Sequence, residues 1–580
     1  MTADQYRGGR RPLLVVTFVV AFCSFAYEFV YSELLTVLYG GTVTQYTLTI
    51  GLYFFALGVG SSLSDDLDPN RPANFTRIEV ALAAIAPAGF LGIVALSTLG
   101  LPPAVEGILA RVPPVIVGFL SGFELPLLTA LVEAESDDDP SLLPTPVRSS
   151  LARLHAGVVA LLGTVFQVDR TGKRSGLSIV LAMDYLGGLV GAVIYATVLY
   201  PDLGLVATVF ALSLLNVVAA LLFVVRFGSR WRPTRQGATA TSAERGRVIA
   251  VLLVLSAAYV GVLATGDVVD DAVTEIYVEG RLQAGYSDAV DVSVTSTFTT
   301  AYQNVVTYDR EWTSDRPNGY FAGDTDTCLG LGTAVQVCES WVEGYHAGLV
   351  DVPASMYPEG PDTRVLVIGG GDWIAVDRLR ERDVTVDLVD IDREFMDYAR
   401  DAPLLARHHD DAYRYERLDV TVGDGYAYLG ETDERYDLIL LDVPGATDSD
   451  LLHLYSREFY QRLRGHLTEN GTVATWTYDR HTYPGHHAAY LTTVRAAGFD
   501  AYLPYWGYED VDDDGTVEPV ERFYVLAAGD RPEFSPETAE GYVARHRDRY
   551  ADARFRPLPG YRGVRASSVF RPNYDLLIDR

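Results

Sequence analysis

Length, charge and hydropathy together do not fit a single soluble domain. The 580 residues carry a formal net charge of −30 at pH 7 and a mean hydropathy of +0.12, so an acidic surface coexists with much apolar sequence. Such an acidic chain repels phosphates, which disfavours nucleic acid as a partner. The three cysteines, Cys23, Cys328 and Cys338, are too few for a disulfide framework or a zinc site of the usual spacing.

The charge is unevenly distributed along the chain. Residues 1–265 hold 18 Asp and Glu and 17 Lys and Arg, whereas residues 266–580 hold 58 and 29. We therefore expect a near-neutral apolar first half and a strongly acidic soluble second half. Lys173 is the only lysine in the sequence. A lysine-poor acidic surface resembles that of proteins from salt-loving archaea, which predicts a halophilic protein of haloarchaeal origin.

The first half contains seven apolar runs, each long enough to cross a membrane. They cover about 13–35, 43–63, 78–100, 114–133, 177–199, 203–226 and 248–265, close to the roughly 20 residues that span a hydrocarbon core. The first run is too long, and the others too numerous, for a cleaved signal peptide. The sequence predicts a multi-pass cell-membrane domain over 1–265, with lipid as its partner. A shorter stretch, 151–167, is expected at the interface or as an eighth crossing.

Basic residues in the loops predict the orientation. With the N-terminus inside, the cytoplasmic loops hold sixteen Arg and Lys and the outer loops hold Arg111 alone, as the positive-inside rule requires. We expect the acidic second half to be cytoplasmic, but seven crossings would place it outside the cell. Three arrangements therefore stay open: a re-entrant 248–265, a crossing by 151–167, or an external second half.

Four acids lie within or at the ends of the apolar runs: Glu28, Glu33, Glu124 and Asp184. Carboxylates are costly in lipid, so they normally pair or line a polar cavity. They indicate either a path or sensing pocket for cations, or hydrogen bonds between helices.

The predicted secondary structure of the second half changes along its length. Residues from about 275 to 360 are typical of short strands and turns. Strand-like runs then cover 365–369, 384–391, 418–422, 436–441, 472–478 and 523–528, and helix-like stretches cover 373–382, 393–400, 453–467 and 485–497. This alternation predicts a doubly wound parallel sheet. Its ligand is expected at the carboxyl ends of the strands.

Acids follow four successive predicted strands. The first strand ends in three glycines, including Gly369 and Gly371, before Asp372; the next three end at Asp390, Asp424 and Asp442. Glycines there let the backbone approach a ligand closely. A GxGxxG dinucleotide motif is disfavoured because position 374 is isoleucine. An acid suits ribose hydroxyls or an adenine amino group, so the spacing predicts a nucleoside-type pocket.

Five stretches of the second half resemble the polyamine aminopropyltransferases (spermidine synthase family): VLVIGGGDW, VDLVDID, VTVGDGYAYL, YDLILLD and SREFYQRLRGHLTENGTVA. The resemblance covers roughly 295–530, and segments of the apolar half are similar to multi-pass members. It implies an α-helical membrane domain over 1–265, a β-rich segment over 266–360 and a Rossmann-like α/β domain of the S-adenosylmethionine-dependent methyltransferase type over 361–530. Residues 531–580 form a C-terminal extension.

The resemblance implies transfer of an aminopropyl group from decarboxylated S-adenosylmethionine to putrescine, giving spermidine and methylthioadenosine. The donor is a co-substrate; neither a prosthetic group nor a metal is expected, and family members are commonly homodimers. By similarity, the catalytic residues are Asp442, as base, and Tyr505, as an assisting group. The donor-binding residues are Gln303, Gly369, Gly371, Asp372, Asp390, Asp424 and Gly425, and the acceptor-binding residues are Gln336, Tyr345 and His346.

The sequence also departs from the family pattern. The second acid of the family's DSxDP segment is missing after Asp442, and Asp448 or Asp450 could replace it. Trp373 stands where the family has glycine, and we expect it near the donor. Two alternatives therefore stay open: a different S-adenosyl-dependent transferase, or a non-catalytic polyamine binder whose membrane half senses or transports cations.

Overall fold

The computed structural model describes residues 10–39, 42–67, 70–134, 176–230, 237–286, 289–314, 322–331, 334–446, 450–512 and 514–577. The chain divides into two compact units, one extending to Val273 and the other running from Thr274 to Arg580. Each unit is described by itself. The stretch 151–167 and Asp448 lie outside the described residues.

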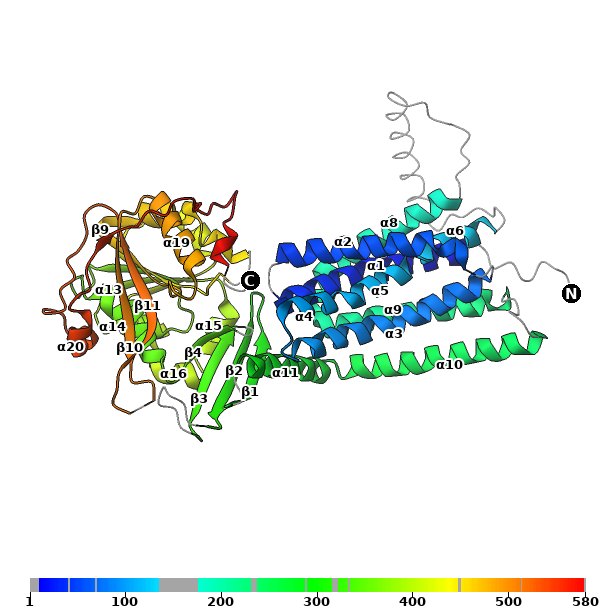
Figure 1. Ribbon diagram of the computed structural model, residues 1–580, viewed down its shortest axis with the longest axis horizontal. Helices are drawn as coiled ribbons and strands as arrows, with labels where there is room; N and C mark the ends of the chain where they lie inside the picture. The colour runs from blue at the N-terminus through cyan, green and yellow to red at the C-terminus, as the bar shows by residue number, and fades with distance from the viewer. Residues whose placement is uncertain are drawn as a thin grey trace, which may run out of the picture. The chain divides into compact units, whose positions relative to one another are not determined.

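The first unit consists of helices (Figure 1). They are α1 (Arg10–Tyr39), α2 (Thr42–Ser62), α3 (Arg71–Ser97), α4 (Pro103–Ala110), α5 (Val112–Ser121), α6 (Glu124–Glu133), α8 (Gly176–Ile194), α9 (Gly204–Phe227) and α10 (Gly237–Ala264). A π-helical segment, Tyr195–Leu203, links α8 to α9. Among the described residues, six helical segments are long and apolar enough to cross a membrane, and one of them, Gly176–Phe227, contains both α8 and α9.

The helices of this unit pack closely and expose apolar side chains outward. A Cβ added at Gly187 would lie 2.4 Å from the carbonyl oxygen of Phe18, so glycine is needed where α8 crosses α1. Phe55 and Val225 are 69% and 80% exposed. Large apolar side chains on the outside of a helical unit are typical of a surface that another apolar phase covers.

The acids expected inside this unit are largely buried. Glu28 and Glu124 are buried, and Glu33 accepts hydrogen bonds from Tyr46 and Tyr200. The sequence reasoning missed Glu79, which is fully buried in α3. Its carboxyl group lies close to that of Glu124 in α6.

The second unit begins with helix rather than with the strands expected from residue 275. Helix α11 (Gly266–Gly285) continues across the unit boundary, and the first strand starts only at Val290. An antiparallel sheet follows, in the order β1 (Val290–Thr299), β2 (Asn304–Trp312), β3 (Thr325–Leu331), β4 (Ala334–Cys338). This sheet confirms the β-rich character of the segment before residue 360.

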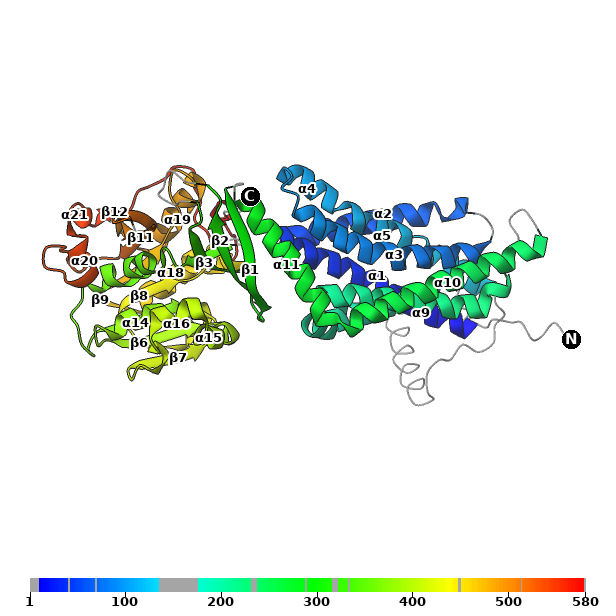
Figure 2. The same cartoon turned by 90° about the horizontal axis from the view of Figure 1, so that it is seen from below.

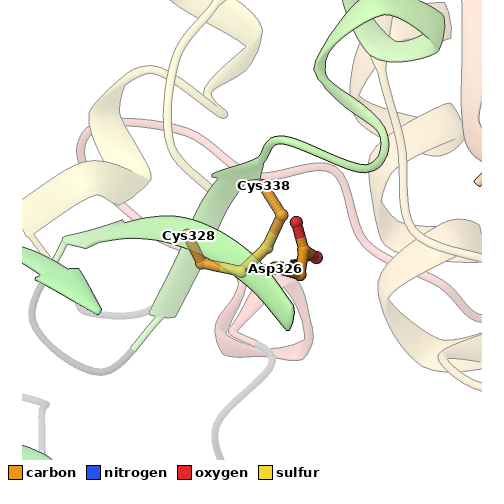
Figure 3. Close-up of side chains that lie close together, drawn as sticks. All are labelled: Asp326, Cys328 and Cys338. Carbon is orange, nitrogen blue, oxygen red and sulfur yellow. Dashed lines mark hydrogen bonds between the residues drawn. A yellow bond between two sulfur atoms is a disulfide. The ribbon is translucent and has the colours of Figure 1, made fainter. Parts of the chain in front are cut away.

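A disulfide joins Cys328 of β3 to Cys338 of β4 (Figure 3). The cysteine count argued against a disulfide framework and against a zinc site, and it did not predict this single disulfide. The antiparallel register places the two residues directly opposite each other, with their Cα atoms 4.0 Å apart. Counting cysteines cannot reveal such a pairing because it depends on the hairpin register.

The main sheet has eight strands in the order β12-β10-β11-β9-β8-β5-β6-β7. Its strands are β5 (Arg364–Gly369), β6 (Thr385–Asp390), β7 (Leu418–Val422), β8 (Tyr436–Asp442), β9 (Leu467–Trp476), β10 (Ala501–Glu509), β11 (Glu518–Ala527) and β12 (Arg556–Pro557). The strands β9, β8, β5, β6 and β7 run parallel to one another, whereas the pairs β9–β11, β11–β10 and β10–β12 are antiparallel. The predicted doubly wound parallel sheet is therefore confirmed for its central part.

Helices cover both faces of this sheet (Figure 2). They are α12 (Val342–His346), α13 (Val352–Ala354), α14 (Ile374–Arg380), α15 (Arg393–Ala399), α16 (Pro403–His409), α17 (Gly425–Glu431), α18 (Arg457–Gly465), α19 (Pro484–Ala496), α20 (Gly541–Arg545) and α21 (Arg547–Tyr550). Alternate residues of β5 enter two different cores: Val365 and Val367 one, Leu366 and Ile368 the other. A strand buried on both faces reads as a continuous apolar run, which explains why VLVIG was recognisable.

Candidate functional site

The strand ends that carry the predicted acids meet at one edge of the sheet. Gly369 of β5 pairs with Asp442 of β8, and Asp390 of β6 pairs with Val422 of β7. Because all four strands are parallel, their carboxyl ends face the same side, where open α/β sheets bind ligands.

The glycine turn after β5 brings the backbone against two of these acids. Gly369 has φ +84°, and a Cβ there would lie 1.9 Å from the carbonyl oxygen of Asp442. The Gly371 N–H donates to Oδ2 of Asp390 at 3.0 Å, and a Cβ on Gly371 would lie 2.8 Å from that oxygen. Glycine is therefore required at both positions for the close approach that the sequence predicted.

Asp372 forms a buried ion pair with His346. Nε2 of His346 lies 3.1 Å from Oδ2 of Asp372, and Nδ1 lies 2.8 Å from the carbonyl oxygen of Val342. Since both partners accept hydrogen bonds, both ring nitrogens carry protons and the ring is an imidazolium. Burial disfavours this charge, but the Asp372 carboxylate outweighs burial and raises the pKa of His346. Burial likewise opposes the carboxylate, and His346 outweighs it and lowers the pKa of Asp372.

Asp442 lies beside this pair and is held by Tyr345. The Tyr345 hydroxyl donates to Oδ1 of Asp442 at 2.8 Å. Burial, with the nearby negative charge of Asp372, raises the pKa of Asp442 to about 6. A carboxylate with a pKa this close to neutrality accepts a proton more readily than an ordinary aspartate and remains largely ionised at pH 7.

Asp390 can still accept hydrogen bonds from a ligand at the same edge of the sheet. Its Oδ1 accepts from the Asp392 N–H at 2.8 Å, and its Oδ2 accepts from Gly371. Burial raises the pKa of Asp390 to about 6. Each carboxylate oxygen has two lone pairs, so one remains on each oxygen for a ligand such as a vicinal diol.

Asp424 caps a helix at the next strand end. Its Oδ1 accepts from the Ala427 N–H at 2.7 Å, and its Oδ2 lies 3.3 Å from Nε2 of His453. A Cβ added at Gly425 would lie 2.5 Å from Cγ2 of Ile368, so this glycine lets helix α17 begin close to β5. Both positions therefore have a structural role beside the expected ligand contact.

Three predicted residues are held away from the acid cluster. Gln303 donates from Nε2 to Asp392 at 2.9 Å rather than meeting Asp372. Gln336 in β4 donates to the carbonyl oxygen of Ala334 in its own strand. Tyr505 is buried and donates to the Gly348 carbonyl oxygen at 2.9 Å, so the assisting contact with Asp442 is made by Tyr345 instead.

Trp373 points into the core rather than toward the expected donor. It is 1% exposed, and its Nε1 donates to the carbonyl oxygen of Met396 at 3.0 Å. Its backbone has φ +70°, a conformation that glycine adopts more easily. The indole is therefore part of the hydrophobic core, and the expected place of Trp373 near the donor stays a prediction.

The position of the missing second acid is occupied by an aromatic group. Gly445 stands there, and a Cβ on it would lie 1.9 Å from the Tyr478 hydroxyl oxygen. Asp448 lies outside the described residues, and the side chain of Asp450 is likewise not described. Within the described residues, Tyr478 therefore takes the space that an acid at position 445 would need.

His346, Asp372 and Asp442 also form a set that a metal ion could use, since their ligand atoms lie within 4.8 Å of one another. However, both nitrogens of His346 already donate hydrogen bonds, to Val342 and Asp372. An incoming metal would have to break one of these bonds. The arrangement is better suited to a cationic ligand that adds to the two carboxylates without displacing the imidazole.

Sequence reasoning missed one half-buried acid of this region, Glu521 in β11. Burial raises the pKa of Glu521 to about 7, and its charge acts on Tyr345. Glu521 belongs to no recognisable motif. Its importance depends on the pairing of β10 with β11, and β10 was not predicted as a strand.

Comparison with known proteins supports the resemblance. A family model described as spermine/spermidine synthase domain matches residues 342–503. A polyamine aminopropyltransferase from Oceanobacillus iheyensis is 27% identical over 458 residues, covering 78% of this chain and 75% of that protein. Polyamine aminopropyltransferase 1 from Streptomyces coelicolor is 28% identical over 505 residues, covering 86% and 81%.

The similarity is not confined to the second unit. Polyamine aminopropyltransferase 2 from Ralstonia nicotianae is 27% identical over 538 residues, which cover 91% of this chain and 89% of that protein. Because the second unit begins at Thr274, an alignment of this length must include most of the helical unit. The two units therefore occur together in relatives.

Proposed function

We propose that this chain is a polyamine aminopropyltransferase, which transfers an aminopropyl group from decarboxylated S-adenosylmethionine to an amine. The observation that carries the proposal is the hydrogen-bonded group formed by the buried His346 and the half-buried Tyr345, Asp372 and Asp442 beside the glycine turn. The matched spermine/spermidine synthase domain and the relatives support the same activity.

The donor occupies the strand ends in this proposal. Asp390 accepts hydrogen bonds from the two ribose hydroxyls with its remaining lone pairs. Oδ2 of Asp424 accepts a hydrogen bond from the adenine amino group. Asp372 faces the aminopropyl end, whose ammonium group it attracts. Two carboxylates against one imidazolium leave the cluster with a net negative charge, which a cationic substrate neutralises.

The acceptor amine is protonated in water and must lose a proton before it can attack. Asp442 takes that proton while the amine nitrogen forms a bond to the donor carbon next to the sulfonium sulfur. The carbon–sulfur bond breaks, its electron pair stays on sulfur, and neutral methylthioadenosine leaves. Tyr345 holds the Asp442 carboxylate in place through its hydrogen bond. The acceptor in this proposal is putrescine, so the product is spermidine.

The experiment that tests the proposal compares two donors. Ordinary S-adenosylmethionine carries a carboxylate that would face Asp372 and Asp442, so repulsion should exclude it, whereas the decarboxylated donor lacks this group. A methyltransferase on the same fold would prefer the ordinary donor, so the comparison separates the two activities.

We also propose that the helical unit is embedded in a membrane. Its six long apolar segments and exposed Phe55 and Val225 support this placement. The catalytic unit is proposed to face the cytoplasm, where its donor is expected to be made. This orientation needs an even number of crossings when the basic loops are cytoplasmic.

Protease added to intact cells should therefore leave the second unit uncut, and permeabilised cells provide the control in which it is cut. Two observations favour the opposite side of the membrane. Seven crossings under the positive-inside rule place the second unit outside. The disulfide between Cys328 and Cys338 does so as well, because disulfides persist mainly in oxidising compartments. Cleavage in intact cells, measured by immunoblot against the C-terminal end, would contradict the cytoplasmic placement.

A further inference from the structure

The C-terminal segment of the second unit and the helix α19 beside it carry a charge opposite to that of the unit as a whole. The segment is red in Figure 1 and runs next to α19. Residues 480–499 and 554–577 together contain seven arginines and one acid, whereas residues 266–580 contain 58 acids and 29 basic residues. We call the surface that these two segments form the basic face. Its arginines are Arg480, Arg495, Arg554, Arg556, Arg562, Arg565 and Arg571.

Contacts at both ends of α19 join the two segments of the basic face. Near the end of the helix, a Cβ added at Gly560 would lie 2.6 Å from Nη1 of Arg495. Near its start, Nδ1 of His486 donates to the carbonyl oxygen of Leu576 at 2.7 Å. The Tyr561 ring also stands edge-to-face with that of His487, with centroids 6.3 Å apart. The arginines of the two segments therefore belong to one continuous surface.

The positive charge of the basic face is not balanced by acids. None of its seven arginines forms an ion pair with an acid in the part of the chain that the structure describes, and six of the seven are exposed. The two acids that flank residues 480–499 are paired with other arginines, as Asp479–Arg522 and Asp500–Arg531. A concentrated positive charge of this kind attracts an anionic partner.

A turn holds one large apolar side chain out of the basic face. Ser568 and Arg571 pair across the turn, and Phe570 at its tip is 93% exposed. Arg565 crosses the base of the turn, where its Nη1 donates to the Arg571 carbonyl oxygen at 2.6 Å. Glu458 accepts from the Ser568 hydroxyl at 2.9 Å. These bonds fix the turn in a shape that leaves the Phe570 ring available to an apolar phase outside the unit.

Three tyrosines are also exposed on the basic face: Tyr483, Tyr561 and Tyr574. Tyrosine combines an apolar ring with a polar hydroxyl, so it is enriched where an apolar phase meets water. Arginines on a surface that also exposes tyrosine and phenylalanine are typical of protein segments that lie on lipid.

Two other anionic partners fit the basic face less well. Nucleic acid is repelled by the many acids of the rest of the unit. The acidic surface of a second copy would pair with the arginines, but burying Phe570 would require a pocket of complementary shape. A fluid lipid phase accommodates an apolar side chain without such a pocket, so an anionic lipid surface satisfies both the charge and the exposed ring.

We propose that the basic face docks on the surface of an anionic lipid bilayer, with its arginines against the headgroups and Phe570 inserted between them. The inference rests on the proposed membrane placement of the helical unit, because that placement keeps a bilayer within reach of the same chain. Anionic headgroups attract clustered arginines, whereas they repel the acidic remainder of the unit. Docking therefore selects one face of the second unit.

The test places a fluorescent reporter at the tip of the turn. Phe570→Cys is labelled with an apolar, environment-sensitive fluorophore; Cys23 is buried and Cys328 is bonded to Cys338, so the label attaches at position 570. The full-length protein is inserted into nanodiscs of phosphatidylcholine, alone or mixed with phosphatidylglycerol. We expect the label to be protected from the neutral quencher acrylamide in the mixed discs and quenched in the others.

A label at Glu469→Cys, an exposed position near the amino end of β9, is the positional control and should be quenched in both kinds of disc. The charge is tested in the labelled protein by Arg562→Gln combined with Arg571→Gln. The ratio of protected to quenched label should fall about 25-fold, or about fivefold for each arginine near an anionic surface. Arg414→Gln combined with Arg417→Gln, two arginines outside the basic face, should leave the ratio unchanged.

Equal quenching at position 570 in both kinds of disc would overturn the proposal. Protection only in discs that hold two copies would assign the basic face to a second copy and would overturn it as well. Embedding of the helical unit is measured separately, by washing reconstituted vesicles with alkaline carbonate. Release of the chain by this wash would contradict the membrane placement, whereas a quenched label on a chain that resists the wash would contradict docking alone.

Discussion

Replacing Asp442 with asparagine is expected to lower kcat by about 10²- to 10⁴-fold, the range that general-base catalysis contributes. Asparagine preserves the side-chain shape and still accepts the hydrogen bond from Tyr345, but it cannot take the proton of the attacking amine. Donor affinity, measured by calorimetry, should change little because the donor contacts are assigned to other residues. Asp419→Asn, an exposed aspartate on strand β7 at the edge of the same sheet, is the control and should keep full activity.

The dependence of kcat/KM on pH tests the role of Asp442 as a base in a second way. Because burial raises the pKa of Asp442 to about 6, the active carboxylate form is present above this pH and is lost as pH falls through it. The kcat/KM of the wild-type protein should decrease below about pH 6, and Asp442→Asn should lack this acidic limb. An unchanged kcat in the asparagine variant would remove Asp442 from the mechanism.

Substituting Gly369 with alanine should be the most disruptive single-methyl change in the site. The added Cβ would lie 1.9 Å from the Asp442 carbonyl oxygen, and alanine would have to adopt φ +84°. A left-handed backbone costs about 1–2 kcal/mol, and overpacking typically costs about 1–3 kcal/mol. We expect the free energy of unfolding to fall by about 2–5 kcal/mol, and activity to be lost because Asp442 is displaced.

Gly423→Ala is the matched control for this change. Gly423 also follows a parallel strand, yet no heavy atom lies within 4 Å of its added Cβ. Both variants are measured by denaturant unfolding of the full-length protein in detergent. Equal stability of the two variants would show that the turn can accommodate a side chain at position 369, against the close packing described above.

The sequence predicted which edge of the sheet carries the candidate site, because the pattern that indicates this edge involves residues close together in the chain. Asp372, Asp390, Asp424 and Asp442 each follow a predicted strand, and the carboxyl ends of parallel strands lie at the same edge of the sheet. Glycine at 369 was recognisable for the same reason, since a strand followed by glycines favours a tight turn. These features depend on residues close together in the chain.

The pairings across the site could not be predicted in this way. Tyr345 meets Asp442 across 97 positions, and His346 meets Asp372 across 26. Tyr505 was predicted as an assisting group, and in the structure its ring is buried in β10 and its hydroxyl donates to the Gly348 carbonyl oxygen. Side-chain direction depends on which face of a strand a residue occupies, and that strand was not anticipated.

Long-range packing also explains the other differences. Trp373 turns inward because its indole packs among the buried apolar side chains of the core. The Cys328–Cys338 bridge depends on a hairpin register, and Glu79 is notable only because α3 buries it completely. None of these three features leaves a signal in the spacing of neighbouring residues.

The most direct test of aminopropyl transfer uses purified full-length protein with putrescine or spermidine and either decarboxylated or ordinary S-adenosylmethionine. Methylthioadenosine and the lengthened amine are quantified together by mass spectrometry. We expect both products to form in equal amounts from the decarboxylated donor only. Methylated product from the ordinary donor, or amine binding without any turnover, would contradict it; the second result would favour a non-catalytic polyamine binder.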